Sequence, residues 1–547
     1  MKILLVTEKF SPDKTQRDGG ARLVDTLKRG FKNCLSIMQF GGQTNSSATW
    51  SFDYPVNLDN RFEKRLANAE FIAKKVKSVE QQFTHIIFIH ISMQFGFIDI
   101  KLREEIKTWT FPMFLTPSYQ ASSENVPSKY TEMEFLTLAN TQNVLTPSYL
   151  EKKQLIEFYA VSKRKIQVVP RGVDTSLLIP KIRFFNKLPV FCSLGSIKPQ
   201  KNTLGLIDLF AKVKNRFSEA TLRIIGPVQN QEYYNAVKNK IKKLGLDNII
   251  ELTGYIPPAK LASAIEDSHI HISTSTCETF GRSIFETLAS GIPNIARIQN
   301  NAAAEFLSDL PYAKFVSNNN EALDAIEEVL NNLPKLSEMS LEIGKLYSEK
   351  ILERLLVAKI HNKKAVAISD FDGTLFHKND YERTKKCMSK FQQFSTKIIC
   401  SARSLNDLLK EIRQNNLKVD WIIAYSGAVI ADGEGNILFI TPIDLKDIKK
   451  LQSLVPEARK ITVSKQVVQM SMPISLLLDI FDLHVEIYQE IAFVANWQSS
   501  KLRAIHRLLN HISWSGTVEA FGDSEYDKEF LTYFGGKFVK TINRVLV

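Results

Sequence analysis

The chain has 547 residues, of which 44% are hydrophobic and 24% are charged. It is too long for a single hydrophobic core, so we expect a globular protein of about three domains. Its formal net charge of +13 favours anionic partners such as nucleotides, phosphorylated metabolites or an anionic membrane surface. No nucleic-acid partner is expected, because the basic residues do not interleave with aromatic ones in a recognisable motif.

The cysteines and the apolar runs favour a cytoplasmic location. The five cysteines are scattered and none lies in a Cys-x-x-Cys pair, which indicates free thiols rather than a disulfide framework. Residues 1–9 are apolar only briefly, as in a first buried strand rather than a signal peptide. The longest apolar run, near 86–100, is interrupted by polar residues, so no segment is expected to span a bilayer. Peripheral contact with the inner face of the cell membrane is a further option.

Short β-rich runs alternate with longer amphipathic stretches, which predicts an α/β fold with parallel sheets. The first strands are predicted at 3–7, 86–91, 113–116, 144–146 and 166–169. A second series is predicted at 190–194, 221–225, 249–253, 270–273 and 292–296, with helices such as 231–244 and 258–266 between them. We therefore expect two Rossmann-like domains, at 1–185 and 186–335.

A connecting helix at 336–362 is expected to lead into a third α/β domain at 363–547. Its strands are predicted at 365–369, 397–400, 421–424 and 518–522. The stretch from about 431 to 496 is richer in alternating patterns, which is typical of antiparallel strands. It is therefore predicted to be a cap inserted into the third domain.

Two glycine turns suggest sites for phosphate. Gly19 and Gly20 stand between the first strand and a helical run, where backbone amides can approach a diphosphate at a helix N-terminus. Residues 195–202 repeat this arrangement after another strand, with Lys201 as a positive charge. A structural turn and a surface lysine remain the alternative interpretations.

A third motif places two glutamates, Glu278 and Glu286, with seven residues between them. Glu278 is expected in a loop after a strand, and Glu286 about two turns into the following helix. Gly281 permits close approach of the backbone, and the helix N-terminus near Ser283 can face a phosphate. The carboxylates can accept hydrogen bonds from sugar and ribose hydroxyls. The spacing alone is common by chance, but the strand, Phe-Gly, helix and Gly-x-Pro context is not.

With these motifs, residues 1–360 resemble a retaining family-4 glycosyltransferase of the GT-B arrangement. Further matches are Gly172-Val173-Asp174, Gly226, Gly254 and Ser290-Gly291-Ile292-Pro293. The resemblance implies that Glu278 contacts the donor sugar, that Glu286 binds the ribose and that Lys201 holds the diphosphate. It also implies a nucleotide-sugar donor and transfer that needs no metal and retains the anomeric configuration. The implied nucleotide-sugar-binding set is Gly19, Gly20, Lys201, Glu278, Phe280, Gly281, Ser283 and Glu286.

The sequence departs from this family at two places. Ser196 stands where the family usually has an arginine, so one phosphate contact is missing unless Lys198 replaces it. The family often carries a histidine after the fifth N-terminal strand, where this chain reads Thr116-Pro117-Ser118-Tyr119. His90 is a candidate substitute, although a core histidine with satisfied hydrogen bonds is the simpler interpretation.

A second catalytic pattern surrounds Asp370 and Asp372, which flank Phe371 just after a predicted strand. Alternate residues face the same way, so both carboxylates can line one pocket. One can attack phosphorus while the other protonates the leaving oxygen. Three later motifs supply the remaining groups of such a site. Ser401 and Lys501 are candidates to hold the phosphate, and Asp523 and Asp527 to bind a hard cation such as Mg²⁺.

Residues 363–547 resemble the haloacid dehalogenase superfamily, in its Cof-like and sucrose-phosphatase-like branch. The resemblance implies that Asp370 is the nucleophile, Asp372 the acid/base, and Ser401 and Lys501 the phosphate ligands. Mg²⁺ is implied at Asp370, Asp372, Asp523 and Asp527. Ser426 and Tyr526 each replace an asparagine that is usual in the family. The cap is expected to select the substrate.

These motifs together predict a bifunctional enzyme. It would transfer a glycosyl group from a nucleotide sugar to an acceptor, expected to be a phosphorylated carbohydrate, and then hydrolyse the phosphate ester through an aspartyl-phosphate. One alternative is a surface-polysaccharide or glycolipid glycosyltransferase whose third domain acts on a separate pathway intermediate or regulates. A degenerate transferase that serves as a scaffold is a further alternative, suggested by Ser196 and the missing histidine.

Overall fold

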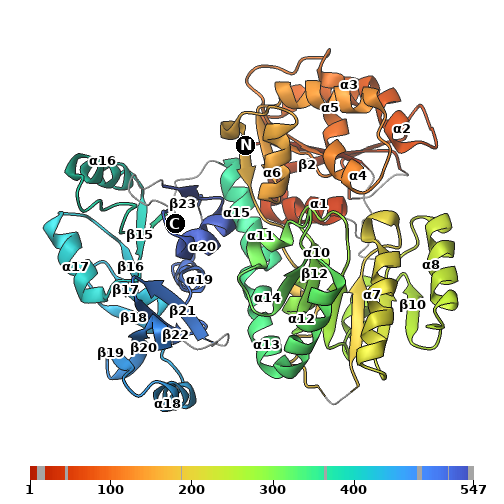
Figure 1. Cartoon of the computed structure of the whole chain (residues 1–547). Coiled ribbons are helices and arrows are strands. Elements are labelled where there is room, and N and C mark those ends of the chain that lie inside the picture. Colours follow the sequence, from red (N-terminus) through yellow and green to blue (C-terminus); the bar gives the residue numbers. More distant parts are fainter. Residues whose placement is uncertain are drawn as a thin grey trace. The chain divides into compact units, whose positions relative to one another are not determined.

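The computed structural model describes residues 1–8, 19–42, 47–185, 188–361, 366–476, 483–514 and 516–539. The chain forms two compact units, Met1–Glu353 and Arg354–Val547 (Figure 1). Three sheets that consist mainly of parallel strands and are flanked by helices, together with a small antiparallel sheet, confirm the predicted α/β class. The loop at 9–18, which precedes the Gly19-Gly20 turn, lies outside the described residues.

The first sheet is parallel throughout, with the strand order β3-β2-β1-β4-β5-β6-β7. Because the order reverses between β1 and β4, the carboxyl ends of these strands lie at the switch point where α/β sheets bind ligands. The strands are β1 (Ile3–Glu8), β2 (Leu35–Phe40), β3 (Trp50–Phe52), β4 (His85–Ile89), β5 (Lys107–Phe111), β6 (Asn143–Thr146) and β7 (Ile166–Val168). The helices are α1 (Gly19–Phe31), α2 (Arg61–Ala67), α3 (Ala69–Lys77), α4 (Thr116–Ala121), α5 (Ser128–Asn140) and α6 (Tyr149–Glu157).

One predicted strand of this sheet is wrong. The run 113–116 is not a strand: β5 ends at Phe111, and Thr116 already begins α4. Pro112 carries no N–H for the ladder, so the strand ends before it in spite of the apolar residues that follow. The strands β2 and β3 were not predicted.

The second sheet is also parallel, with the order β10-β9-β8-β11-β12-β13. Its strands are β8 (Val190–Leu194), β9 (Thr221–Ile225), β10 (Ile250–Gly254), β11 (Ile270–Ser273), β12 (Asn294–Arg297) and β13 (Ala313–Val316). Its helices are α7 (Thr203–Arg216), α8 (Gln231–Lys243), α9 (Pro258–Ala264), α10 (Arg282–Ala289), α11 (Ala303–Leu307) and α12 (Asn319–Asn331). The strand predicted at 292–296 begins two residues later, after Gly291 with its φ of +83° and after Pro293.

Three helices follow where a single connecting helix was predicted. They are α13 (Leu333–Ser340), α14 (Glu342–Leu346) and α15 (Glu349–His361). Between the last two, the backbone of Ser348 forms a β-bridge with Val173, whose N–H donates to the oxygen of Tyr347 at 2.8 Å. The returning chain is thereby fastened to the segment that joins the first two sheets.

The third sheet belongs to the second unit and has the order β18-β17-β16-β15-β14-β23-β24. Its strands are β14 (Val366–Ser369), β15 (Thr396–Cys400), β16 (Trp421–Ala424), β17 (Val429–Asp432), β18 (Ile437–Ile440), β23 (Val518–Gly522) and β24 (Lys537–Phe538). The strand β17 pairs antiparallel with both β16 and β18, and the other neighbouring strands pair in parallel. The accompanying helices are α16 (Tyr381–Phe391), α17 (Leu405–Gln414), α19 (Lys501–His511) and α20 (Lys528–Phe534).

The cap is a separate four-stranded antiparallel sheet with the order β19-β20-β22-β21. It comprises α18 (Leu445–Leu454), β19 (Arg459–Val463), β20 (Gln466–Pro473), β21 (Leu483–Tyr488) and β22 (Ile491–Asn496). The predicted start near 431 is too early, because the β17–β18 hairpin extends the third sheet instead. Its alternating sequence is typical of any antiparallel pair, so the pattern could not distinguish the two sheets.

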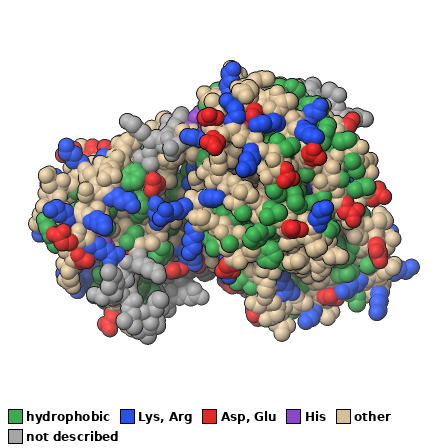
Figure 2. All heavy atoms as spheres, turned by 90° about the horizontal axis from the view of Figure 1, so that it is seen from above, with side chains coloured by type: hydrophobic (Ala, Val, Ile, Leu, Met, Phe, Trp, Pro, Cys, Tyr) green, Lys and Arg blue, Asp and Glu red, His purple; other side chains and the backbone are tan. Residues whose placement is uncertain are grey.

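All five cysteines are free. None of the described helices is both long and apolar enough to cross a lipid bilayer. On the face seen in Figure 2, lysines and arginines are interspersed with acidic and hydrophobic side chains.

Candidate active sites

The first site is built around α10 of the second sheet. Gly281 is the N-cap of this helix and has a φ of +80°, a left-handed conformation that favours glycine. The loop before it is fixed by its backbone: the N–H of Glu278 donates to the oxygen of Asn300 at 2.8 Å, and its oxygen accepts from Ala302 at 2.9 Å. The amide of Ile284 donates to the oxygen of Gly281 at 2.9 Å, whereas those of Arg282 and Ser283 precede the first intrahelical bond and are available to an anion.

Glu278 is paired with the lysine of the other glycine turn. Lys201 Nζ lies 2.5 Å from Glu278 Oε1, and Glu278 is 7% exposed. Burial alone would raise the pKa of Glu278, but Lys201, Ser275 and Lys198 together hold it below its ordinary value. The carboxylate is therefore ionised and can accept hydrogen bonds from a ligand.

Glu286 lies further along α10 and is paired with an arginine that the sequence analysis did not identify. Arg22 of α1 donates from Nη1 to Glu286 Oε1, and both side chains are about one-tenth exposed. In Figure 1, α1 and α10 lie where the two halves of the first unit meet. This ion pair thus joins the Gly19-Gly20 turn to the second glutamate.

The loop after β8 brings Lys198 and Lys201 to the same site. Its path requires glycine at 226, where a Cβ would lie 2.1 Å from the oxygen of Gly195. Lys198 forms no ion pair with the described residues, and burial and the charge of Lys201 lower its pKa. Arg282 at the start of α10 is also partly buried, and burial and the charge of Arg22 lower its pKa to about 10. The site therefore carries cationic charge in excess, which suits a phosphate.

The predicted contact from Phe280 is confined to its backbone. The ring is 4% exposed and stacks on Phe285 with centroids 4.4 Å apart. It also packs against Phe306 in the core of the domain. Its role in nucleotide-sugar binding remains a prediction that only the peptide groups can fulfil.

His90 lies at the carboxyl end of β4 with a φ of +78°. The N–H of Ser92 donates to Nδ1 at 3.2 Å, so the ring proton is on Nε2. Nε2 is buried and has no hydrogen-bond partner among the described residues. Burial lowers the pKa of His90 to about 3, so the ring is neutral. His90 is therefore buried like a core histidine, but one of its two nitrogens is unsatisfied.

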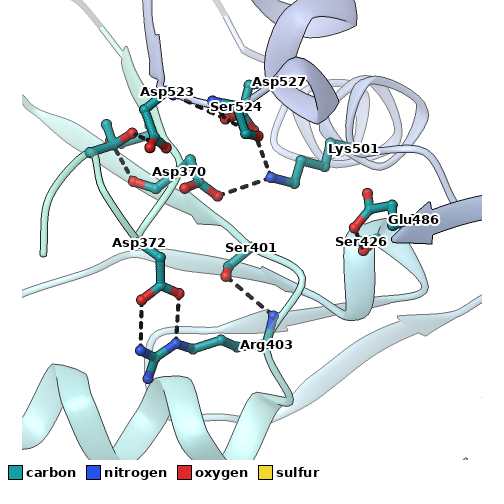
Figure 3. Close-up of polar contacts among 12 residues, drawn as sticks. Asp370, Asp372, Ser401, Arg403, Ser426, Glu486, Lys501, Asp523, Ser524 and Asp527 are labelled. Carbon is teal, nitrogen blue, oxygen red and sulfur yellow. Dashed lines mark hydrogen bonds and ion pairs between the residues drawn. The ribbon is translucent and has the colours of Figure 1, made fainter. Parts of the chain in front are cut away.

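The second site lies at the carboxyl end of β14 in the second unit (Figure 3). Asp370 follows this strand and is 6% exposed. Lys501, the first residue of α19, places Nζ 2.9 Å from Asp370 Oδ1 and 2.6 Å from Asp527 Oδ1. Burial raises the pKa of Asp370 to about 8 although Lys501 acts against it.

Three carboxylates converge at this point. One oxygen from each of Asp370, Asp523 and Asp527 lies within 4.8 Å of the others. Asp527 Oδ2 accepts from the N–H of Asp523 at 3.1 Å and from the N–H and Oγ of Ser524 at 3.0 and 2.8 Å. Thr374 Oγ1 donates to Asp523 Oδ1 at 3.2 Å. A set of fixed, hard oxygen donors of this kind fits Mg²⁺.

Asp372 lies apart from the three carboxylates. Arg403 binds it in a bidentate manner, with Nε and Nη2 each 2.6 Å from a carboxylate oxygen. Arg403 also donates to Glu411 Oε1 at 3.2 Å, and its backbone N–H donates to Ser401 Oγ at 3.2 Å. The predicted metal set is thus brought together in three of its four members, and the role of Asp372 stays a prediction.

Comparison with known families matches both parts of the chain. Residues 174–345 match the family described as glycosyl transferases group 1, and residues 367–472 match haloacid dehalogenase-like hydrolases. The chain joins a group 1 glycosyltransferase domain to a haloacid dehalogenase-like hydrolase domain. We call Met1–Glu353 the transferase unit and Arg354–Val547 the hydrolase unit.

Two curated relatives resemble the transferase–hydrolase chain over part of its length. The protein named probable sucrose-phosphate synthase from Thermosipho melanesiensis is 30% identical over 41% of this chain and 52% of its own. Mannosylfructose-phosphate synthase from Agrobacterium fabrum is 25% identical over 30% of this chain and 39% of its own. The chain therefore spans about half or less of the length of these relatives.

A solved structure shows the same fold. Sucrose-phosphate synthase from Thermosynechococcus elongatus superposes with a TM-score of 0.56 over 66% of this chain and 98% of its own, at 16% identity. At that identity the likeness concerns the fold alone. It agrees with the two Rossmann-like sheets of the transferase unit.

In the transferase–hydrolase chain, sequence reasoning missed the partners of the predicted residues. Arg22 and Glu486 are far in sequence from the group they contact, so no local motif marks them. Arg403 belongs to the Ser401-Ala402-Arg403 motif, but its pairing with Asp372 was not predicted. The predicted residues Glu278, Lys201, Glu286 and Gly281 do lie around one loop and helix, and Asp370, Lys501, Asp523 and Asp527 lie together in the other unit. A hint was present for Arg22, which follows the glycine pair by two residues.

Proposed function

We propose that the chain transfers a glycosyl group from a nucleotide sugar to a phosphorylated carbohydrate and hydrolyses the phosphate ester. Both named relatives are synthases of sugar phosphates, which favours a phosphorylated acceptor. The observation that carries the hydrolytic half is the Asp370–Lys501–Asp527 arrangement, a buried carboxylate held by a buried ammonium. A purely structural module has no need of that pair, because buried ion pairs add little stability on average.

In the transfer step, the cationic groups of the first site would bind the diphosphate. The candidates are Lys201, Lys198 and the amides of α10, which together replace the arginine absent at Ser196. Glu278 would accept hydrogen bonds from the donor sugar and Glu286 from the ribose, so Arg22 must share or release Glu286 when the nucleotide binds. Because this mechanism relies on fixed charges, no metal is invoked for transfer, and we keep the predicted retention of configuration.

In the hydrolytic step, Asp370 would attack phosphorus. An Asp370–phosphorus bond forms while the ester bond breaks, and water then releases phosphate and restores Asp370. Asp372 would give a proton to the leaving oxygen, which requires it to turn from Arg403. Lys501 orients Asp370 and would neutralise charge on the phosphoryl group, to which the Ser401 hydroxyl would donate a hydrogen bond. Mg²⁺, when held by Asp370, Asp523 and Asp527, would offset the repulsion between the carboxylate and the phosphate dianion.

Separate assays of the two activities test this proposal. Purified full-length protein with Mg²⁺ is expected to release phosphate from a panel of sugar phosphates, and Asp370→Asn should abolish this release. A thermal-shift screen of UDP-, GDP- and ADP-sugars should find a stabilising nucleotide, and Lys201→Ala should weaken it. Phosphate release that survives Asp370→Asn would refute the hydrolase assignment. The predicted cytoplasmic location and peripheral membrane contact stay predictions.

A further inference from the structure

A carboxylate from the cap is enclosed beside the loop of the hydrolase site that contains Ser426. Glu486 lies on β21, and Ser426 lies just after β16 of the core (Figure 3). Ser426 Oγ donates to Glu486 Oε2, and His484 Nε2 lies 3.2 Å from Glu486 Oε1. Glu486 is 5% exposed and Ser426 is 1% exposed. A charged group is thus buried where the cap meets the core.

The core side of this contact is conformationally strained. Tyr425 and Ser426 are both in the left-handed region, with φ values of +51° and +56°. Residues other than glycine rarely adopt this conformation, and they keep it only where the surroundings hold them. Gly427 must be glycine, because a Cβ would lie 2.4 Å from the oxygen of Ser499. The strained loop ties the N–H of Ser426 to the oxygen of Ser401 at 3.1 Å and turns its hydroxyl to Glu486.

Glu486 can accept more hydrogen bonds than the described residues donate to it. Burial raises its pKa, but His484, Lys501 and Ser426 together lower it below its ordinary value. An ionised carboxylate offers about four acceptor positions and no donor. The described residues use two of them, through Ser426 and His484. A group that fills the rest must therefore be a donor.

The position of β21 is fixed by the loop that carries the metal-site carboxylates. The N–H of Ile487 donates to Tyr526 Oη at 2.7 Å, and Tyr526 Oη donates to the oxygen of Ile487 at 3.0 Å. Tyr526 stands immediately before Asp527 in the chain. The residue next to Glu486 is thus hydrogen-bonded to the loop that carries Asp523 and Asp527, which fixes the position of Glu486 relative to that loop.

We propose that Glu486, supported by Ser426, is the subsite that accepts hydrogen bonds from hydroxyl groups on the alcohol part of the phosphate ester. The inference rests on the proposed phosphatase function. Asp370 and Lys501 contact only the phosphate group of the ester. Glu486 contacts its alcohol part and so distinguishes a polyhydroxylated ester from one without hydroxyls. A site built around a buried polar group rejects analogues that leave this group unpaired, so the arrangement selects sugar phosphates.

The test compares a hydroxyl-rich substrate with a hydroxyl-free one. Full-length parent, Glu486→Gln and Glu486→Ala are assayed with Mg²⁺ on hexose and disaccharide phosphates and on p-nitrophenyl phosphate. The ratio of kcat/KM for the best sugar phosphate to that for p-nitrophenyl phosphate should fall about ten-fold or more in Glu486→Ala, mainly through KM. The isosteric Glu486→Gln should fall less, and Glu490→Gln, an exposed carboxylate after the same strand, should leave the ratio unchanged.

Each other outcome overturns the subsite. An equal loss on both substrates would make Glu486 a structural residue, and an unchanged ratio would remove its role in selectivity. A parent that prefers glucosamine 6-phosphate over every neutral sugar phosphate would make the subsite one for an ammonium. If the parent hydrolyses p-nitrophenyl phosphate but prefers no sugar phosphate, the proposed subsite is refuted and the proposed phosphatase activity is not. Hydrolysis of neither refutes both.

Discussion

At the residue scale, the transferase site depends on charges that neutralise one another before any ligand arrives. Lys201 holds Glu278 and Arg22 holds Glu286, so both glutamates of the motif are paired. Removing one partner of a buried pair leaves the other uncompensated, which is more damaging than losing the pair. The unexpected Arg22 is therefore the most informative single position of this site.

Arg22→Ala is expected to weaken nucleotide binding by about ten-fold or more, because Glu286 then carries an uncompensated negative charge beside the diphosphate. The measurement is calorimetric titration with the nucleotide that the thermal-shift screen selects. Arg29→Ala is the matched control: Arg29 lies on the same helix and forms ion pairs with Glu349 and Glu353, but its side chain is 43% exposed. Equal affinity of Arg22→Ala and parent would exclude Arg22 from the site.

Glu151 provides a prediction for pH dependence. It is fully buried, one carboxylate oxygen accepts from Thr146 at 3.0 Å, and the other has no partner among the described residues. Burial raises its pKa to about 8. Between about pH 4.5 and pH 8, Glu151 is protonated in the folded protein but ionised in the unfolded chain. The free energy of unfolding therefore falls as the pH rises across this window.

Glu151→Gln removes this titration. The stability of the variant relative to parent should therefore rise by about 1.4 kcal/mol per pH unit across that window. Urea unfolding at pH 5 and pH 8 measures the difference. A gap between variant and parent that does not change with pH would show that the carboxyl is ionised in the folded protein throughout.

At the element scale, the start of α10 is the part of the transferase that the sequence describes best. Glycine at 281, a strand before it and a helix after it are all local features, and the structure places Gly281 as the left-handed N-cap. The pairing of α1 with α10 through Arg22 and Glu286 is not local, because 264 positions separate the two residues. For the same reason the β17–β18 hairpin was assigned to the cap: alternation shows that a strand is antiparallel but not which sheet it joins.

Gly281→Ala tests the element, and Gly245→Ala is its control. Both glycines have a positive φ, +80° and +64°, so each alanine should lower the free energy of unfolding by about 1 kcal/mol. A Cβ at 281 would also lie 3.1 Å from Ala303 Cβ, whereas at 245 nothing lies within 4 Å. Only Gly281→Ala should therefore shift the first turn of α10 and lower transfer activity. Equal activity of both variants would contradict a role for this turn in holding the donor.

At the scale of the whole molecule, the order of two enzyme domains on one chain is what the sequence predicted most securely. Each domain has several motifs in a fixed order, and chance rarely reproduces such a series. The sequence did not predict the partners of the catalytic groups or the limits of the cap, because long-range packing decides both. The proposed selection of sugar phosphates depends on Glu486, which belongs to no motif and is recognised only from its contacts in the fold.

The coupling of transfer to hydrolysis is the central claim, and product analysis of one reaction tests it. Parent protein, Glu278→Ala and Asp370→Asn are each incubated with the selected nucleotide sugar, candidate sugar phosphates and Mg²⁺, and the products are identified by mass spectrometry. Parent should give an unphosphorylated glycoside and free phosphate. Asp370→Asn should accumulate the phosphorylated glycoside, and Glu278→Ala should form no glycoside at all. An unphosphorylated glycoside from Asp370→Asn, or a phosphorylated one that parent leaves intact, would contradict the account.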